Sequence, residues 1–310
     1  MPELDILAIG EPLGEFAETE RNGERLFLPG FGGDTSNVAV AAARQGARVG
    51  YFTHLGDDAF GQAFLDLWDR EGVDRSCVVT RPGSRTGIYF ITYGPDGHRF
   101  SYVRDGSAAS LVGPADLPLD RIAAARCLHV SGISQAISAS AADSVFAAIR
   151  HARAHGRLVS YDTNLRLALW PLDRARAVIH AAIAGADLAR PGLDDARKLT
   201  GLEAPDEIVD FYLGLGCRLV AMTLGKDGVL VATASERRLV PPHRVEAVDA
   251  SGAGDCFGGA FLAEWLAHGD PFRAAAYGNV AAALKTLGQG AVAPVPHRAE
   301  VEAALSGRLT

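Results

Sequence analysis

The sequence predicts an α/β fold: a central, mostly parallel β-sheet with helices on both faces, plus a small second β-sheet. Short apolar segments alternate with longer segments of helical periodicity along most of the chain, which is typical of parallel sheets. Two regions interrupt this alternation: one is a short strand flanked by glycines, and the other is a pair of strands with two-residue periodicity. A chain of 310 residues can bury a large core, and its length alone allows one large domain or two.

The alternating elements begin with a strand at residues 4–9 and a helix at residues 37–45. Asp34, Thr35 or Ser36 would cap this helix and Gly46 would end it. Further strands are expected at residues 49–53, 126–130, 158–161, 187–189 and 219–223. Further helices are expected at residues 59–71, 139–155, 174–184, 194–199 and 205–213. Because no repeat or low-complexity linker interrupts them, we expect a single domain over residues 1–310.

The second sheet is expected from three short strands. One lies at residues 26–28, and two more at residues 86–93 and 99–104 are joined by the turn Gly94-Pro95-Asp96-Gly97. Such a small sheet buries little apolar surface by itself. We therefore expect residues of about 12–33 and 84–106 to form a lid over a site, a dimer contact, or both.

Composition excludes several classes of partner. The formal net charge is −7 and the isoelectric point is about 5.7, with arginines scattered among acids, so neither nucleic acid nor a membrane surface is an expected partner. The four cysteines, Cys77, Cys127, Cys217 and Cys256, form no CxxC pair, which disfavours a zinc site or a disulfide framework. With no leader pattern or membrane-length apolar segment, a cytoplasmic protein is expected.

The segment Asp249-Ala250-Ser251-Gly252-Ala253-Gly254-Asp255 is the strongest functional signal. It places a glycine turn directly before a segment of apolar helical residues. Glycines allow backbone N–H groups to approach an anion, and a helix N-terminus adds positive potential. A carboxylate beside such an anion site repels its ligand unless it has a task, such as accepting a proton from an attacking hydroxyl. The pattern predicts phosphoryl transfer with Asp255 as the base.

Other glycine motifs fit less well. A dinucleotide-binding fingerprint requires glycine where Phe257 stands, and a P-loop requires Ser or Thr after Gly225-Lys226, where Asp227 stands. The plainer alternative is a tight turn at a helix start with an acid in the first helical turn, where acids are common.

Three further features accompany this segment. Phe31-Gly32-Gly33-Asp34-Thr35-Ser36-Asn37 is a second glycine turn that opens a helix and suits hydroxyl recognition, although an ordinary capped helix would have the same composition. Thr223-Leu224-Gly225-Lys226-Asp227-Gly228 is a loop that could pass a nucleotide or be a plain hairpin. Arg104 and Arg166 stand at strand ends, where ligands of open α/β sheets bind, and a guanidinium suits a carboxylate or phosphate.

The two glycine turns, in this order and separation, resemble the signatures of the ribokinase-like (PfkB-type) carbohydrate kinases over almost the whole chain. Within that family the sequence is most similar to the 2-keto-3-deoxygluconate kinases. The segments that carry this similarity are Gly10-Glu11-Pro12-Leu13, Gly87-Ile88-Tyr89, Tyr102 to Ala108, His129 to Ile133, and Asp162-Thr163-Asn164-Leu165-Arg166 with Trp170.

The resemblance implies ATP, Mg²⁺, a small β lid that mediates dimer contact, and transfer to the terminal hydroxyl of 2-keto-3-deoxy-D-gluconate. It also leaves room for a monovalent cation such as K⁺. It implies that Asp255 is the base and that the backbone of Gly252, Ala253 and Gly254 holds phosphoryl charge. The implied sugar-acid residues are Gly33, Asp34, Asn37, Tyr89, Tyr102, Arg104 and Arg166. The implied nucleotide residues are Thr223, Gly225, Gly228 and Asn279, and the implied metal residues are Asp195, through water, and Asp249.

The chain departs from the family pattern at three places. Gly192 and Asp195 stand in the Asn-x-x-Glu element that organises Mg²⁺, Val103 replaces a common lid aromatic, and Gly288-Gln289-Gly290 lacks an acid that some relatives have. A kinase of a neutral sugar such as fructose, a nucleoside kinase, and a non-catalytic sugar-acid sensor remain the alternatives. The two arginines favour an acid substrate over the first two, and the intact Asp255 turn disfavours the sensor.

Overall fold

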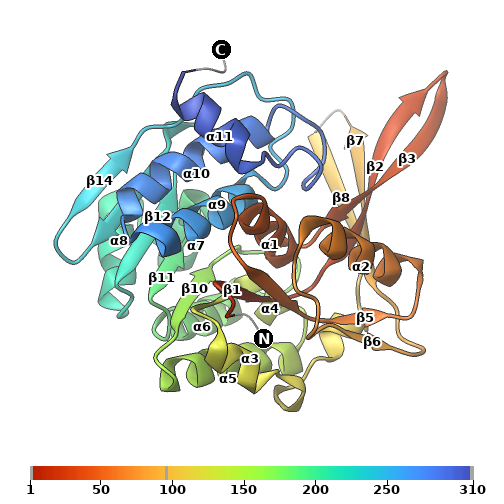
Figure 1. Cartoon of the computed structure of the whole chain (residues 1–310), viewed down its shortest axis with the longest axis horizontal. Coiled ribbons are helices and arrows are strands. Elements are labelled where there is room, and N and C mark those ends of the chain that lie inside the picture. Colours follow the sequence, from red (N-terminus) through yellow and green to blue (C-terminus); the bar gives the residue numbers. More distant parts are fainter. Residues whose placement is uncertain (1–2, 95–96, 308–310) are drawn as a thin grey trace.

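The computed structural model describes residues 3–94 and 97–307. Its central sheet has eight strands in the order β14-β13-β12-β11-β10-β9-β1-β4 (Figure 1). Strands β12 to β4 pair in parallel, and β13 and β14 extend one edge as antiparallel strands. Their bounds are β1 Ile6–Ile9, β4 Val49–Phe52, β9 Cys127–Ser131, β10 Leu158–Asp162, β11 Leu188–Arg190, β12 Leu219–Thr223, β13 Val229–Thr233 and β14 Arg237–Val240. The expected mostly parallel sheet is confirmed.

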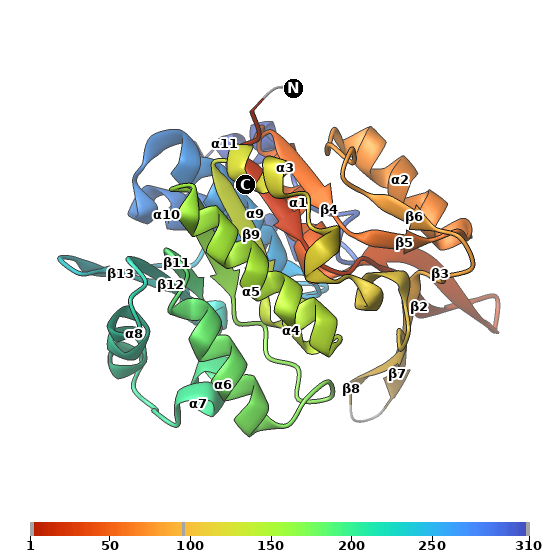
Figure 2. The same ribbon diagram turned by 90° about the horizontal axis from the view of Figure 1, so that it is seen from below.

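Helices cover both faces of this sheet. Side chains of β1 alternate between two apolar cores, with Leu7 and Ile9 in one and Ile6 and Ala8 in the other. The first core is closed by α5 Ala139–Ala154, α6 Leu172–Ile183, α7 Leu193–Thr200 and α8 Pro205–Gly214. The second is closed by α1 Asp34–Arg44, α2 Ala59–Glu71, α9 Ala253–His268 and α10 Pro271–Lys285. Figure 1 shows α5 and α6 on one side of the sheet and α9 and α10 on the other, and Figure 2 shows α5 and α6 in front of it.

Short elements complete the fold. They are the helices α3 Leu119–Ala124, α4 Gly132–Ala136 and α11 Arg298–Leu305, the 3-10 segments η1 Ala108–Leu111, η2 Pro114–Asp116 and η3 Gly225–Asp227, and the strand pair β5 His54–Gly56 and β6 Val79–Arg81. Within residues 3–94 and 97–307, none of the helices has the length and apolar content that crossing a bilayer requires.

The second sheet has four strands in the order β3-β2-β7-β8. Their bounds are β2 Leu13–Arg21, β3 Glu24–Gly32, β7 Gly87–Gly94 and β8 Gly97–Val103. Strands β2 and β3 extend as a long ribbon away from the central sheet (Figure 1). Only residues 26–28 of this ribbon were expected as a strand, because the many charged residues of β2 hide its alternation. The predicted turn residues 95 and 96 lie outside the described residues.

One helix start differs from the prediction. Helix α1 begins at Asp34 with Gly33 as its N-cap, so Asp34, Thr35 and Ser36 are helical residues and not caps. The physical reason is tertiary: all three side chains are buried, the Thr35 and Tyr51 hydroxyls share a hydrogen bond, and the Ser36 hydroxyl accepts one from the Trp68 indole N–H.

Candidate active site

A cavity of about 820 Å³ lies at the carboxyl ends of the parallel strands. Four of them deliver residues to its wall: Glu11 follows β1, Asp162 ends β10, Arg190 ends β11 and Thr223 ends β12. The four-stranded sheet, described above, contributes another part of the wall, which includes Tyr89 and Tyr102. Parallel strands direct all their carboxyl ends to one edge, which is why residues far apart in sequence meet here.

The glycine turn before α9 forms one wall. Gly252 has φ 69°, and a Cβ there would lie 2.9 Å from the Cβ of Ala291, so only glycine fits this position. The Ala253 N–H donates to the Ala250 carbonyl at 3.1 Å. It is therefore not free to bind an anion, the role that the resemblance implied for Ala253. The N–H groups of Gly254 and Asp255 have no acceptor among the described residues, and both residues line the cavity. Two free amides at a helix N-terminus can hold an anion.

Asp249 stands behind this turn. Its carboxylate accepts the Ser251 N–H at 2.8 Å through Oδ1 and the Gly290 N–H at 2.8 Å through Oδ2. Asp249 is absent from the cavity wall. Both oxygens therefore hold the backbone of the turn, an arrangement that fits a supporting role better than the metal-ligand role expected for Asp249.

Asp255 lies between two glycine turns. The Asn37 Nδ2 of α1 donates to its Oδ2 at 2.8 Å. Burial and the nearby Asp34 carboxyl raise the pKa of Asp255 to about 7, while the Asn37 hydrogen bond acts in the opposite direction. A carboxyl with a pKa near neutrality can accept a proton from a substrate hydroxyl at physiological pH.

Arg190 supplies positive charge beneath Asp255. Its Nη2 lies 3.1 Å from the Asp162 carboxylate and donates to the Gly254 carbonyl at 2.9 Å. Its Nε and Nη1 are buried without a hydrogen-bond partner among the described residues. Burial raises the pKa of Asp162 to about 6, against the lowering effect of Arg190. Arg190 thereby links the end of β11 to the glycine turn.

The wall opposite the glycine turn is aromatic and comes from the four-stranded sheet. The rings of Tyr89 and Tyr102 stack with centroids 5.7 Å apart, and the Tyr89 hydroxyl donates to Glu15. Arg104 lines the cavity as expected, but it pairs with Glu11, which also accepts from Ser107 at 2.6 Å. Because Glu11 offsets its charge, Arg104 is not the free cation that the sequence reasoning expected.

Arg166 is different. It is exposed at the cavity wall, its Nη1 donates only to the Leu165 carbonyl at 2.9 Å, and it makes no ion pair with the described residues. Arg99 of β8 also lines the cavity without an ion pair in this part of the chain. Asn164, two residues before Arg166, donates from Nδ2 to Asp34 at 2.9 Å. The cavity therefore holds two cations that a ligand could neutralise.

The expected nucleotide residues divide into two groups. Thr223 lines the cavity, whereas Gly225, Gly228 and Asn279 lie outside its wall. The Asn279 Nδ2 of α10 donates to the carbonyls of Val240 at 3.3 Å and Pro241 at 2.8 Å. Asn279 thus orders the segment after β14 in this structure.

A Mg²⁺ site would need oxygen ligands, and the described residues contain no group of three or more His, Cys, Asp or Glu side chains that could hold a metal. Asp195, the carboxylate expected to hold Mg²⁺ through water, lines the cavity. Burial raises its pKa, Arg166 lowers it, and its Oδ2 accepts the Leu165 N–H at 3.0 Å. Mg²⁺ keeps several waters and takes few protein ligands when phosphates are present, so this donor set fits an ion held mainly by a nucleotide.

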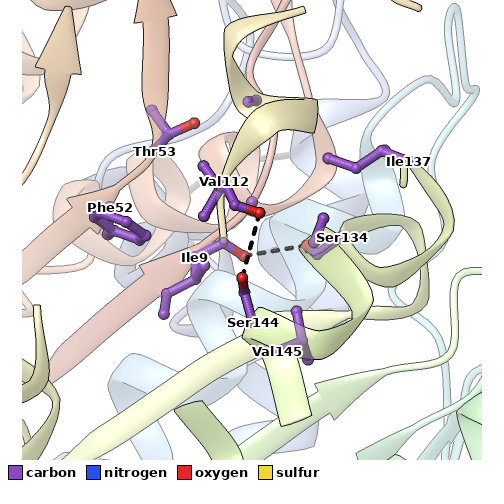
Figure 3. A pocket seen from close by; sticks show the side chains of 11 residues that line it. Ile9, Phe52, Thr53, Val112, Ser134, Ile137, Ser144 and Val145 are labelled. Atoms are coloured by element: carbon purple, nitrogen blue, oxygen red, sulfur yellow. Dashed lines mark hydrogen bonds between the residues drawn. The ribbon is translucent and has the colours of Figure 1, made fainter. Parts of the chain in front are cut away.

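A second cavity, of about 20 Å³, lies near the end of β1 (Figure 3). Its wall is mainly apolar, with Phe52 and Val145 among its residues. The Ser134 hydroxyl donates to Ile9 at 3.1 Å and the Ser144 hydroxyl to Val112 at 3.3 Å. A space of this size admits one water molecule at most, so it is not a substrate site.

Sequence reasoning missed Glu11, Asp162, Asn164, Arg190 and Arg99 as site residues. Glu11, Asp162 and Arg190 stand at or just beyond the ends of expected strands, so the rule that selected Arg166 could also have selected them. Arg99 had no such signal, because its position depends on how the second sheet lies against the first.

Comparison with known proteins identifies the family of the chain. Residues 7–298 match the pfkB family carbohydrate kinases. The chain is 33% identical to a 2-dehydro-3-deoxygluconokinase of Bacillus subtilis over 99% of this chain and 97% of that one. It is also 33% identical to a probable fructokinase-4 of Arabidopsis thaliana over 97% of both chains.

A solved structure shares the fold. A putative ribokinase II from E. coli, in complex with ATP and Mg²⁺, superposes with a TM-score of 0.90 at 25% identity, covering 98% of this chain and 99% of that one. The family match spans nearly all of the chain, including both glycine turns. The chain therefore belongs to the pfkB family of carbohydrate kinases and is a phosphotransferase that acts on a sugar hydroxyl.

Proposed function

We propose that this kinase transfers the γ-phosphoryl group of ATP to the terminal hydroxyl of 2-keto-3-deoxy-D-gluconate. The observation that carries this choice of substrate is Arg166, an exposed cavity cation with no ion-pair partner among the described residues, although its charge lowers the pKa of the nearby Asp195. A sugar acid supplies that partner, whereas a neutral sugar leaves the guanidinium unpaired. Arg99 offers a second such cation.

In the proposed reaction Asp255 accepts the proton of the attacking hydroxyl. The hydroxyl oxygen forms a bond to the γ-phosphorus as the bond between that phosphorus and the ADP oxygen breaks. The free N–H groups of Gly254 and Asp255 stabilise charge on the transferred group, as preorganised donors do. Mg²⁺, when bound with ATP, would neutralise phosphate charge, with Asp195 as its nearby carboxylate. The nucleotide is proposed to bind beside Thr223, Gly225 and Gly228. Asn279 would act indirectly, by ordering the segment after β14 on the nucleotide side.

The four-stranded sheet is the proposed lid. Tyr89 and Tyr102 would contact the sugar face, Gly33 and Asp34 would contact its hydroxyls, and Asn37 would orient Asp255. Water exclusion by such a lid favours transfer to sugar over hydrolysis of ATP. Arg104, which pairs with Glu11, would hold the lid side of the site in shape and is a less direct carboxylate contact than Arg166.

A substrate panel tests this proposal. ADP release would be measured with 2-keto-3-deoxy-D-gluconate, with fructose and with a nucleoside, for the wild type and for Arg166→Ala. We expect the acid to be the best acceptor and the variant to raise its KM at least about tenfold, because a hydrogen bond to a charged group contributes about 1.5–3 kcal/mol. The control is Arg150→Ala, an exposed arginine on α5.

Equal effects of Arg166→Ala on acid and neutral acceptors would contradict the carboxylate assignment. A fructokinase is the second candidate, supported by the Glu11 pairing of Arg104 and by the equal identity to a probable fructokinase. If the wild type prefers fructose to the sugar acid, the protein is a fructokinase.

We further propose a homodimer formed through the lid. Cross-strand partners Leu28, Ala17, Ile91 and Phe100 form an apolar row across the four strands. Leu28 is 53% exposed and Phe100 is 45% exposed. A second copy of the same sheet would bury this row in both chains.

A further inference from the structure

The chain buries one of its few lysines completely. Only three lysines occur among its 30 lysine and arginine residues: Lys198, Lys226 and Lys285. Lys198 and Lys226 are exposed, whereas Lys285, the last residue of α10, is 0% exposed. Removing an ammonium from water is costly, so a buried one needs compensating contacts or a task.

The contacts of Lys285 lead directly to the glycine turn. Its Nζ donates to the Asp249 carbonyl at 2.9 Å. The next residue, Thr286, accepts the N–H groups of Val248 at 2.7 Å and Asp249 at 3.0 Å. The end of α10 thus binds the segment that precedes the glycine turn through three hydrogen bonds, one of them from a charged donor.

The same segment is held from its other side. The Asp249 carboxylate binds the Ser251 and Gly290 N–H groups, as described above, and Gly252 packs against Ala291. Burial by itself would raise the pKa of Asp249. The hydrogen bonds to its carboxylate and the Lys285 charge outweigh burial, and the pKa is lowered below its ordinary value. An ammonium at this point offsets the Asp249 carboxylate and binds the Asp249 carbonyl, at a helix C-terminus that itself favours a cation.

We propose that Lys285 is a built-in monovalent cation that fixes residues 249–255 in their anion-binding form, so that turnover needs no dissociable monovalent cation. Lys285 is a positioning residue, because it acts through Asp249 and lies outside the cavity wall. The proposal rests on the phosphotransferase activity of the family and not on the choice of acceptor.

The test compares Lys285→Ala with Lys285→Met in a buffer whose only cations are Mg²⁺ and bulky organic amines. The acceptor is the one that the wild type uses best, so failure of the proposed substrate shows in the wild type before any variant is assayed. We expect the wild-type kcat to change less than twofold when NH₄Cl or KCl is added. Both variants should lose at least about tenfold in kcat, since misplaced catalytic groups are costly.

Added NH₄⁺ should restore Lys285→Ala in a saturable way, because alanine leaves space for a small cation. It should not restore Lys285→Met, whose side chain fills that space. Lys198→Met, an exposed lysine, is the matched control, and thermal unfolding would confirm that each variant is folded. A wild type that KCl activates more than fivefold would overturn the proposal. So would folded variants with wild-type kcat, or a folded Lys285→Ala that no cation restores.

Discussion

At the scale of single residues, the environment of Asp255 decides its chemistry. Burial and Asp34 raise its pKa to about 7, and the Asn37 hydrogen bond orients the carboxylate. An exposed aspartate would be ionised throughout the physiological range and would be a weaker base. The sequence placed Asp255 beside an anion site, but its neighbours Asp34 and Asp162 come from other turns of the chain.

Asp255→Asn is therefore expected to lower kcat by about 10²-fold or more, the range of general-base catalysis. In the wild type, kcat/KM should fall as the pH decreases through about 7, because the proposed base must be deprotonated. Steady-state kinetics between pH 5 and 9 would check both statements. Asp143→Asn, an exposed acid on α5, serves as the control.

The stability of the same variant has a definite sign. The folded-state pKa of Asp255 is raised from 3.8 to about 7, so its contribution to stability falls as the pH rises between these two values and then stays constant above about 7. Asp255→Asn should consequently unfold at the same or a higher temperature than the wild type at pH 8. A large loss of Tm together with the loss of kcat would show that Asp255 supports the fold and not only the reaction.

At the scale of elements, helix α9 packs closely against Arg190 at the end of β11. A Cβ at Gly258 would lie 1.9 Å from the Arg190 Nη1, so this glycine is needed for the guanidinium to pass beneath the helix. The contact holds Arg190 against Asp162 and the Gly254 carbonyl. It couples the central sheet to the glycine turn through one buried side chain.

Gly258→Ala should destabilise the protein by about 1–3 kcal/mol, as overpacking does, and should also reduce kcat by displacing Arg190. The cost should shrink when Arg190→Met removes the guanidinium. Urea unfolding of the wild type, both single variants and the double variant measures this coupling. Strictly additive costs would mean that α9 accommodates the methyl group elsewhere.

At the scale of the whole molecule, two apolar cores enclose the central sheet, but one face of the four-stranded sheet has an apolar row whose two ends, Leu28 and Phe100, are exposed. That row continues toward the cavity, where Phe100 lines the wall. A dimer through this face would therefore join the two sites and would change the freedom of the lid.

Leu28→Glu should convert the proposed dimer to a monomer, since a charge in a buried apolar contact is costly. Light scattering at several concentrations would measure the mass. Leu239→Glu is a matched control, because Leu239 is 59% exposed on β14 of the central sheet. A wild type that is monomeric, or a Leu28→Glu protein with unchanged mass, would refute the dimer.

Prediction from sequence succeeded where local signals were strong. Helix α2 and strand β12 have the predicted bounds, and the other predicted elements of the central sheet and its helices lie within two residues or so of them, with α1 extending further at its start. Strand β2 was missed because its charged residues belong to a ribbon whose pairing is set at a distance. Of the predicted site residues, those beside strand ends and glycine turns line the cavity, whereas Asp249, Ala253, Gly225, Gly228 and Asn279 do not.

The sequence by itself determined the fold class and the phosphoryl-transfer motif, because periodicity and glycine turns depend on neighbouring residues. Only the tertiary structure decided which charges are free. Arg104 and Arg166 look alike in sequence, yet Glu11 neutralises the first and no described carboxylate pairs with the second. Charge pairing, like the burial of Lys285 and the raised pKa of Asp255, depends on residues brought together from distant segments, and these interactions leave no local pattern.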